Sequence, residues 1–261
     1  MHFHIADAYI VGESPLHTAD PRVKVALTIL MILLVNLTPV GAFGAYVAFF
    51  AIMMLGAVTA RIDPLLVARR SLIALVFAGA AVTLVFTVPG PTLGVVPVTG
   101  WPISEPGLVR FASIIFKSMI SVQAAALLIL TTQFTDTLWA LGALHVPGVL
   151  VAIISFMYRY IFVLVEEAVR LQRARESRSA VLSGKGPSLM FQARTTGRMI
   201  GSLLVRSFAR SERVYQAMVA RGYQGELRVI SPPQISRRDV LIAGIPLLLG
   251  LLLLVSSLLL Q

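Results

Sequence analysis

Long apolar runs separated by short polar stretches dominate the chain. A membrane-spanning helix needs about 20 mostly apolar residues, because the hydrocarbon layer offers no water to backbone groups. Five runs meet this requirement: residues 23–38, 41–60, 71–88, 107–131 and 240–260. The pattern therefore predicts an all-α integral membrane protein with about five transmembrane helices.

A sixth apolar run, residues 149–165, carries Tyr158, Arg159 and Tyr160 near its middle. Charge has to decide whether it crosses the membrane, since cytoplasmic loops hold the excess of Lys and Arg. The loop after the second span contains Arg61, Arg69 and Arg70, whereas residues 89–106 contain neither Lys nor Arg. The first loop is therefore expected inside and the second outside, which places the N-terminus in the cytoplasm.

The region from Arg170 to Arg238 holds 14 of the 22 basic residues. If residues 149–165 crossed the bilayer, this basic region would lie outside. We therefore expect residues 149–165 to lie in or under the inner leaflet, with Arg159 reaching toward the headgroups. The expected organisation is an N-terminal transmembrane region, residues 1–131, a cytoplasmic or inner-leaflet arm, residues 132–238, and a C-terminal transmembrane helix, residues 239–261.

Composition agrees with lipid as the main solvent, since 57% of residues are hydrophobic and 13% are charged. The net charge of +10 is also typical of nucleic-acid binding, but here the positive charge lies beside membrane spans. Orientation and anionic lipid account for it, so no nucleic-acid partner is expected. The first 22 residues lack the features of a signal peptide, so the first span is expected to be retained.

Each of the two long helices predicted for the arm ends in one Arg between small residues. The two triplets are Ser177-Arg178-Ser179 and Ala220-Arg221-Gly222, and Gly222 is typical of a helix C-cap. An Arg at a helix C-terminus is favourable to the helix dipole in any case. Its occurrence at two equivalent places suggests more, because a guanidinium flanked by small residues is able to bind a partner carboxylate through two bonds.

Ordered motifs along most of the chain resemble the transmembrane (T) component of energy-coupling-factor transporters, of the CbiQ type that serves cobalt or nickel uptake. They are residues 20–24 (DPRVK), 131–136 (TTQFTD), 146–147 (VP), 158–162 (YRYIF) with Glu166 and Glu167, and 217–223 (AMVARGY). The family's paired motif is small-Arg-small, commonly Ala-Arg-Gly. Residues 220–222 match it fully, whereas residues 177–179 use serines.

The resemblance implies a non-catalytic coupling subunit in a bacterial inner membrane, with the N-terminus and an arm of long coupling helices in the cytoplasm. Two ATPase subunits would hold ATP and Mg and bind the two Arg motifs. A membrane-embedded substrate-binding subunit of the CbiM type would hold Co or Ni, and a small accessory membrane subunit is a further candidate partner. No cofactor is expected in this chain.

The apolar face of the arm is expected to contact the substrate-binding subunit. The candidate residues are Phe156, Phe162, Met199, Leu203 and Phe208. Two alternatives stay open: a conventional ABC permease that forms the substrate path itself, and a membrane-embedded enzyme. The first would usually offer one main coupling helix, and the second would need clustered His, Asp or Glu, which the sequence does not show.

Other chemistry is sparse. The chain has no phosphate-binding GxxxxGK[ST] loop, so ATP hydrolysis is expected from a partner. His2 and His4 are potential ligands for Co or Ni, although two histidines near a terminus are more often incidental. Lys117 lies within the fourth predicted span, where an internal partner and a subunit interface are equally good explanations.

Overall fold

The computed structural model describes residues 9–95, 102–178, 188–225 and 235–259. These residues form two compact units. One is a helical bundle made of residues 9–144 and 235–259. The other is an arm made of residues 145–225. The candidate histidines His2 and His4 and the residue Ser179 lie outside the described residues.

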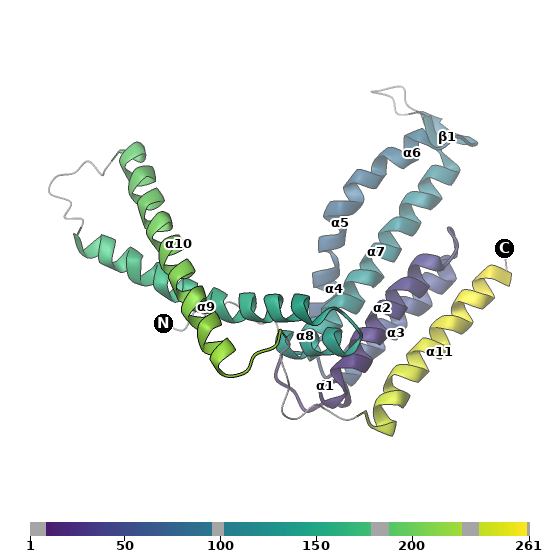
Figure 1. The fold of residues 1–261 in the computed structure, drawn as a ribbon. Helices are drawn as coiled ribbons and strands as arrows, with labels where there is room; N and C mark the ends of the chain where they lie inside the picture. Colours follow the sequence, from purple (N-terminus) through teal and green to yellow (C-terminus); the bar gives the residue numbers. More distant parts are fainter. Residues whose placement is uncertain (1–8, 96–101, 179–187, 226–234, 260–261) are drawn as a thin grey trace. The chain divides into compact units, whose positions relative to one another are not determined.

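The bundle contains the following elements (Figure 1): α1 Pro15–Thr18, α2 Pro21–Leu37, α3 Phe43–Thr59, α4 Pro64–Ser71, α5 Ile73–Ala78, the 3₁₀ helix η1 Gly79–Thr83, α6 Leu84–Thr87, β1 Thr92–Val95, β2 Pro102–Ser104, α7 Glu105–Thr131, α8 Phe134–Ala143 and α11 Arg237–Leu259. The arm contains α9, Gly148–Arg178, and α10, Leu189–Ala220. The all-α membrane class is confirmed, and the short antiparallel pair of β1 and β2 is a small exception.

Local sequence sets where the bundle helices begin. The Asp20 side chain accepts a hydrogen bond from the backbone N–H of Arg22 at 2.8 Å, and Pro21 occupies the first helical position of α2. The Ser104 hydroxyl accepts one from the N–H of Gly107 at 3.2 Å at the start of α7. Both are N-caps that satisfy donors left free by the first helical turn.

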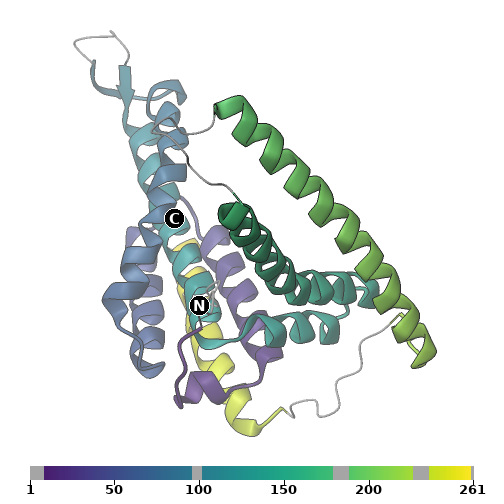
Figure 2. The same ribbon diagram turned by 90° about the vertical axis from the view of Figure 1, so that its left-hand side faces the viewer.

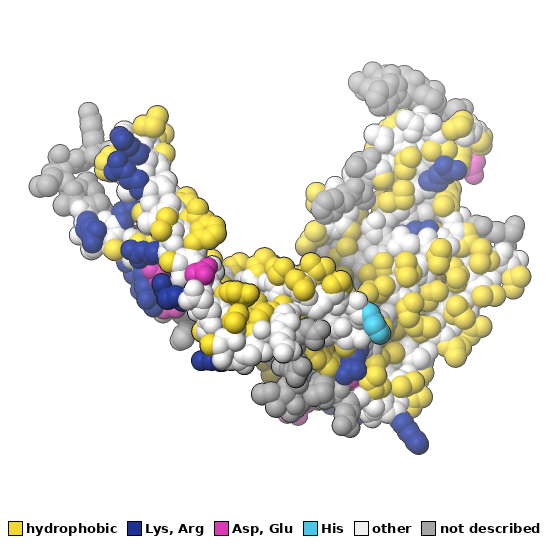
Figure 3. Space-filling view, viewed as in Figure 1, with side chains coloured by type: hydrophobic (Ala, Val, Ile, Leu, Met, Phe, Trp, Pro, Cys, Tyr) yellow, Lys and Arg dark blue, Asp and Glu magenta, His cyan; other side chains and the backbone are white. Residues whose placement is uncertain are grey.

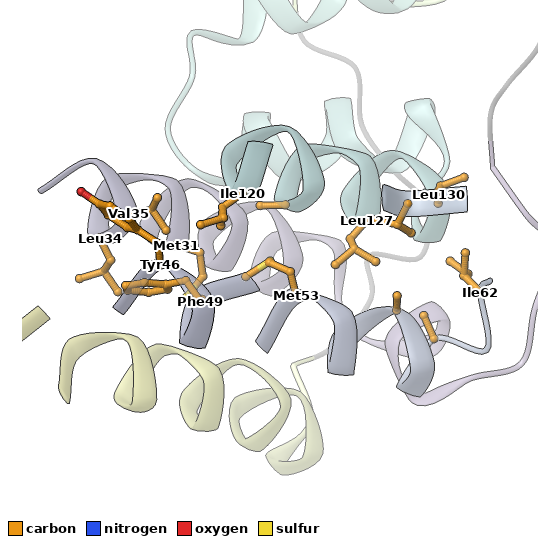
Figure 4. Packing of buried hydrophobic residues seen from close by; sticks show 14 residues of the cluster. Met31, Leu34, Val35, Tyr46, Phe49, Met53, Ile62, Ile120, Leu127 and Leu130 are labelled. Carbon is orange, nitrogen blue, oxygen red and sulfur yellow. The ribbon is translucent and has the colours of Figure 1, made fainter. Parts of the chain in front are cut away.

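The core of the bundle lies between α2, α3, α4 and α7. It is built from apolar side chains, among them Val35, Tyr46, Phe49, Ile120 and Leu130, which are at most 1% exposed (Figure 4). Helix α11 closes onto this core at Gly250. A Cβ there would lie 3.1 Å from Leu34 and 3.2 Å from Phe49, so glycine permits the close packing of α11 against α2 and α3.

Two lysines join α2 and α7, and each bonds to the C-terminal end of the other helix. The Lys24 Nζ donates to the backbone oxygen of Thr131, the last residue of α7, at 3.0 Å. The Lys117 Nζ donates to the backbone oxygens of Asn36 at 3.0 Å and Thr38 at 2.6 Å, at the end of α2. Each helix thus supplies a cation to the partial negative charge at the other's C-terminus. For Lys117, the structure gives an internal partner.

The third predicted span, residues 71–88, is not one helix. The helical path begins earlier, at Pro64, and passes through α4, α5, η1 and α6, with a bend of 64° between its two halves. Gly79 opens the 3₁₀ stretch in the middle, where glycine is a poor helix former and a 3₁₀ turn is a common site of bending. Hydropathy alone did not reveal this break.

Length and composition mark three described helices as able to cross a membrane: α7, α9 and α11. The bent pair α4–α6 would be a fourth if it counts as one span. Helices α2 and α3 have 17 residues each and pack against α7 and α11 in the bundle. Helix α9 covers the sixth apolar run. On the ground of charge, this run was predicted not to cross the membrane, and this stays a prediction.

Candidate functional site

The arm consists of two long helices that run in roughly opposite directions and cross, as Figures 1 and 2 both show. Their contacts follow an antiparallel order along the chain. The Arg175 guanidinium donates to the Thr196 hydroxyl at 3.1 Å, Glu167 contacts Arg206, and the ring of Phe156 meets that of Tyr223. The C-terminal end of each helix therefore points away from that of the other.

Arg178 is the last residue of α9 and is exposed. The preceding Ser177 turns its hydroxyl back to the backbone oxygen of Ala174 at 3.1 Å, which leaves the end of the helix flanked by a small, internally bonded side chain. A cation in the last turn also interacts favourably with the helix dipole. The guanidinium of Arg178 is thus exposed at the C-terminal end of α9.

Arg221 caps α10 in a Schellman motif. The N–H of Tyr223 donates to the backbone oxygen of Met218 at 3.0 Å, and the N–H of Gly222 donates to that of Val219 at 2.9 Å. Gly222 has a φ of +84°, in the left-handed region that glycine enters without strain. The prediction that Gly222 is a C-cap is confirmed.

The same cap brings Tyr223 back onto α9. Its ring lies 6.4 Å from that of Phe156, edge to face, between centroids. Aromatic pairs favour this geometry, so the contact fixes the end of α10 against α9. Arg221 consequently projects from a turn that is held by two backbone bonds and one aromatic contact.

The two arginines lie far apart along the arm. Arg221 is next to Tyr223, which contacts Phe156, whereas Arg178 lies about six turns further along α9, roughly 33 Å at 1.5 Å per residue. One small acidic site on a partner cannot reach both guanidinium groups at once. The antiparallel crossing therefore presents two separate cationic tips.

An ion-pair cluster joins the helices between these tips. The Glu167 Oε1 accepts a hydrogen bond from Arg206 at 2.9 Å, and its Oε2 lies 3.6 Å from Arg210. The hydrogen bond from Arg206 lowers the pKa of the Glu167 carboxyl below its ordinary value of 4.5. Sequence reasoning missed this link. The only signal was that Arg206 and Arg210, four residues apart on α10, share one helix face.

The neighbouring Glu166 has a partner on its own helix. It pairs with Arg170 on its own helix at 2.7 Å, with both side chains about two-thirds exposed. Such an exposed pair contributes little stability, of the order of a few tenths of a kcal/mol. Glu166 therefore supports α9 locally, whereas Glu167 connects α9 to α10.

The predicted interface residues occupy different surroundings. Phe208 is 67% exposed, and the rings of Tyr158 and Phe162 pair edge to face at 5.2 Å. Phe156, Phe162, Met199 and Leu203 are half-buried. Their assignment to a subunit interface stays a prediction. Figure 3 shows the apolar and basic side chains of the arm lying in adjacent bands.

Two hollows lie between the arm helices at the Arg221 end. One has a volume of about 980 Å³ and is lined by polar groups that include Arg159 and Arg221. The other has a volume of about 560 Å³ and is mainly apolar, with Phe208 and Met157 among its walls. Both are open hollows on the surface of the arm.

The described residues show no group of three or more His, Cys, Asp or Glu placed to hold a metal ion. His17, which is described, is engaged locally, because its Nδ1 lies 2.6 Å from the Ser14 hydroxyl. Burial lowers the pKa of this imidazole. The described side chains of the arm thus offer cations at helix ends and apolar surfaces.

The CbiQ family model, described as cobalt transport protein, matches residues 12–231. The cobalt transport protein CbiQ of Rhodobacter capsulatus is 29% identical over 59% of this chain and 58% of its own length. The energy-coupling factor transporter transmembrane protein EcfT of Brevibacillus brevis is 30% identical over 83% of each chain.

A third relative joins two proteins in one chain. It is the putative fused cobalt transport protein CbiMQ of Methanocorpusculum labreanum, which is 26% identical over 85% of this chain and 37% of its own length. The chain spans about half the length of several of the curated relatives that it matches.

Proposed function

The chain belongs to the CbiQ family of cobalt transport proteins, and we propose that it is the non-catalytic coupling subunit of an energy-coupling-factor importer for cobalt or nickel ions. Arg178 and Arg221 are the groups that bind two ATPase subunits. The observation that carries this role is the placement of two exposed guanidinium groups at the C-terminal ends of two crossing helices. A pair of ATPase subunits offers two equivalent acidic sites, as the two separate tips require.

Coupling in this proposal is mechanical. Closure of the ATPase pair on ATP and Mg shifts the two tips, and the crossing helices transmit the shift to the membrane face of the arm. The Glu167 cluster and the Phe156–Tyr223 contact make the pair move as one body. A change of this kind biases a two-state equilibrium in a partner and needs no bond to form or break in this chain.

The substrate-binding partner is a membrane-embedded subunit of the CbiM type, with a small accessory membrane subunit as a further member. The fused CbiMQ relative supports this pairing, because fusion places the two functions in one protein. Cobalt or nickel is cargo held by that partner. The apolar arm residues, with the exposed Phe208 foremost, form the surface against which it moves.

The orientation we propose is that of a multi-pass protein of the bacterial inner membrane with the arm in the cytoplasm. The 14 basic residues between Arg170 and Arg238 support it through the positive-inside rule. Helix α9 then lies along the inner leaflet, although its length and hydropathy would allow it to span.

The direct test replaces the arginine at the end of each arm helix. Arg178→Ala and Arg221→Ala should each weaken copurification of the ATPase subunits and lower cobalt uptake by cells, and the double variant should abolish uptake. The matched control is Arg194→Ala with Arg198→Ala, which removes two exposed arginines of α10 away from its end. Normal uptake by the tip double variant would refute the assigned role.

Two further measurements separate the alternatives. The chain has no Cys, so Arg178→Cys or Arg221→Cys reports accessibility alone, and labelling by an impermeant reagent from outside the cell would contradict the orientation. Purification of the tagged chain should retain an ATPase and a separate membrane subunit. Uptake that needs only this chain and an ATPase would instead favour the permease.

A further inference from the structure

The two hollows of the arm adjoin each other and together make up the groove of the arm. They share five lining residues, which come from α9, α10 and the cap that follows α10: Phe156, Tyr160, Val214, Met218 and Tyr223. A single elongated ligand can therefore lie across both hollows.

The two ends of this groove differ in chemistry. The larger hollow has Arg159 and Arg221 in its wall, beside the polar side chain of Gln224. The smaller hollow is lined mainly by apolar side chains, including Ile153, Leu164 and Phe208, and the arginine in its wall, Arg210, is paired with Glu167. Among the described residues, neither lining set includes an acidic side chain, and no ion pair engages Arg159 or Arg221. The polar end is thus a site of uncompensated positive charge next to an apolar channel.

We propose that this groove binds one anionic glycerophospholipid. The phosphate lies at Arg159 and Arg221, where a guanidinium can donate two parallel hydrogen bonds to its oxygens. One acyl chain follows the apolar hollow past Phe208. Tyr160 and Tyr223, in the wall common to both hollows, present an apolar ring and a polar hydroxyl, which is the pairing found at membrane interfaces.

A lipid fits better than a free anion or a protein segment. A free anion would leave the apolar hollow unused, and the apolar window of α9 is only 6% buried within the protein despite its mean hydropathy of 2.2. That surface has to meet lipid or another apolar partner. The adjoining pair of arginines selects an amphiphile with a negative head, since it adds charge complementarity at one end only.

This site does not depend on the proposed function, although Arg221 belongs to both. Arg159 belongs to the lipid site alone, so its replacement separates the two roles. In the transporter, an ATPase carboxylate and a lipid phosphate would compete for Arg221.

Native mass spectrometry of the purified full chain in detergent tests the proposal without any ATPase. With phosphatidylglycerol added, the wild-type chain should retain one lipid, and with phosphatidylcholine it should retain at least tenfold less. Arg159→Gln should lower phosphatidylglycerol retention about tenfold, as expected for one charge-assisted contact. Arg198→Gln, an exposed arginine outside the groove, is the control and should leave retention unchanged.

Several outcomes would overturn the proposal. They are equal retention of the two lipids, equal loss in Arg159→Gln and Arg198→Gln, and displacement of the lipid by inorganic phosphate at the same concentration. Photocrosslinking in membranes from a benzophenone amino acid at position 164, which lines the apolar hollow and is not among the residues assigned to the subunit interface, identifies the occupant of the groove. Crosslinks to phospholipid support the lipid site, whereas crosslinks to a second membrane protein alone contradict it.

Discussion

The bundle and the arm use similar apolar residues in opposite ways. In the bundle, Tyr46, Phe49 and Leu130 are fully buried against other helices of the same chain. In the arm, Ala152 is the one buried residue of α9, and the described helix α10 has none. The bundle is thus held by its own packing, whereas the arm keeps large apolar side chains available for lipid and partners. One chain therefore contains a part with an internal apolar core and a part with almost none.

The largest expected effect on stability comes from replacing one phenylalanine by alanine in each unit and comparing the two variants. Phe49→Ala removes a ring that is 0% exposed, and it should cost about 3–5 kcal/mol because the cavity cannot be filled. Phe208→Ala removes a ring that is 67% exposed, and it should change stability by less than about 0.5 kcal/mol while lowering uptake.

Thermal unfolding in detergent and cobalt uptake at matched expression measure the two responses. A large loss of stability in Phe208→Ala would mean that the arm has a core of its own, and the contrast between the units would fail.

A smaller effect is expected from the lysines that join α2 and α7. Lys24→Met keeps the apolar stem and removes the donor that satisfies the backbone oxygen of Thr131, which should cost about 1–3 kcal/mol. Lys117→Met removes the matching bonds to Asn36 and Thr38. The arm variant Arg198→Met is the control and should leave the unfolding temperature unchanged. An unchanged temperature in both lysine variants would show that packing alone holds these helices.

Local patterns in the sequence were enough to predict most bundle helices and one helix end of the arm. Apolar runs mark the bundle helices, because burial in lipid or protein imposes the same composition along a whole helix. The end of α10 at Arg221 and Gly222 could be predicted from the sequence, since a Schellman cap depends on a few adjacent residues.

Contacts between residues far apart in the sequence could not be predicted from local patterns. The bond from Lys24 to Thr131 joins residues 107 positions apart, and that from Arg206 to Glu167 joins residues 39 apart. Both depend on the register of two antiparallel helices, which one sequence does not specify. The bend between α4 and α6 was missed for a related reason. The hydropathy of a segment does not depend on whether its helix is straight or bent.

The smallest effect concerns how the arm helices are held together. Glu167→Gln removes the charge that faces Arg206 and Arg210, so the crossing should loosen while the bundle keeps its unfolding temperature. Spin labels introduced by Gln172→Cys and Ala193→Cys, one on each helix, should report a broader distance distribution. Glu212→Gln is the control, because Glu212 bonds to Gln216 on its own helix.

Acid should reproduce the effect of Glu167→Gln in the unsubstituted arm. The folded-state pKa of Glu167 lies below its ordinary value of 4.5, because Arg206 stabilises the carboxylate. The link is therefore fully formed above pH 4.5 and is lost as the pH falls through the lower folded value. The label distances should broaden only in that acidic range, and Glu167→Gln should abolish this dependence. Broadening near neutral pH would assign the crossing to another group, and a pH-independent narrow distribution would leave packing at Phe156 and Tyr223 as its cause.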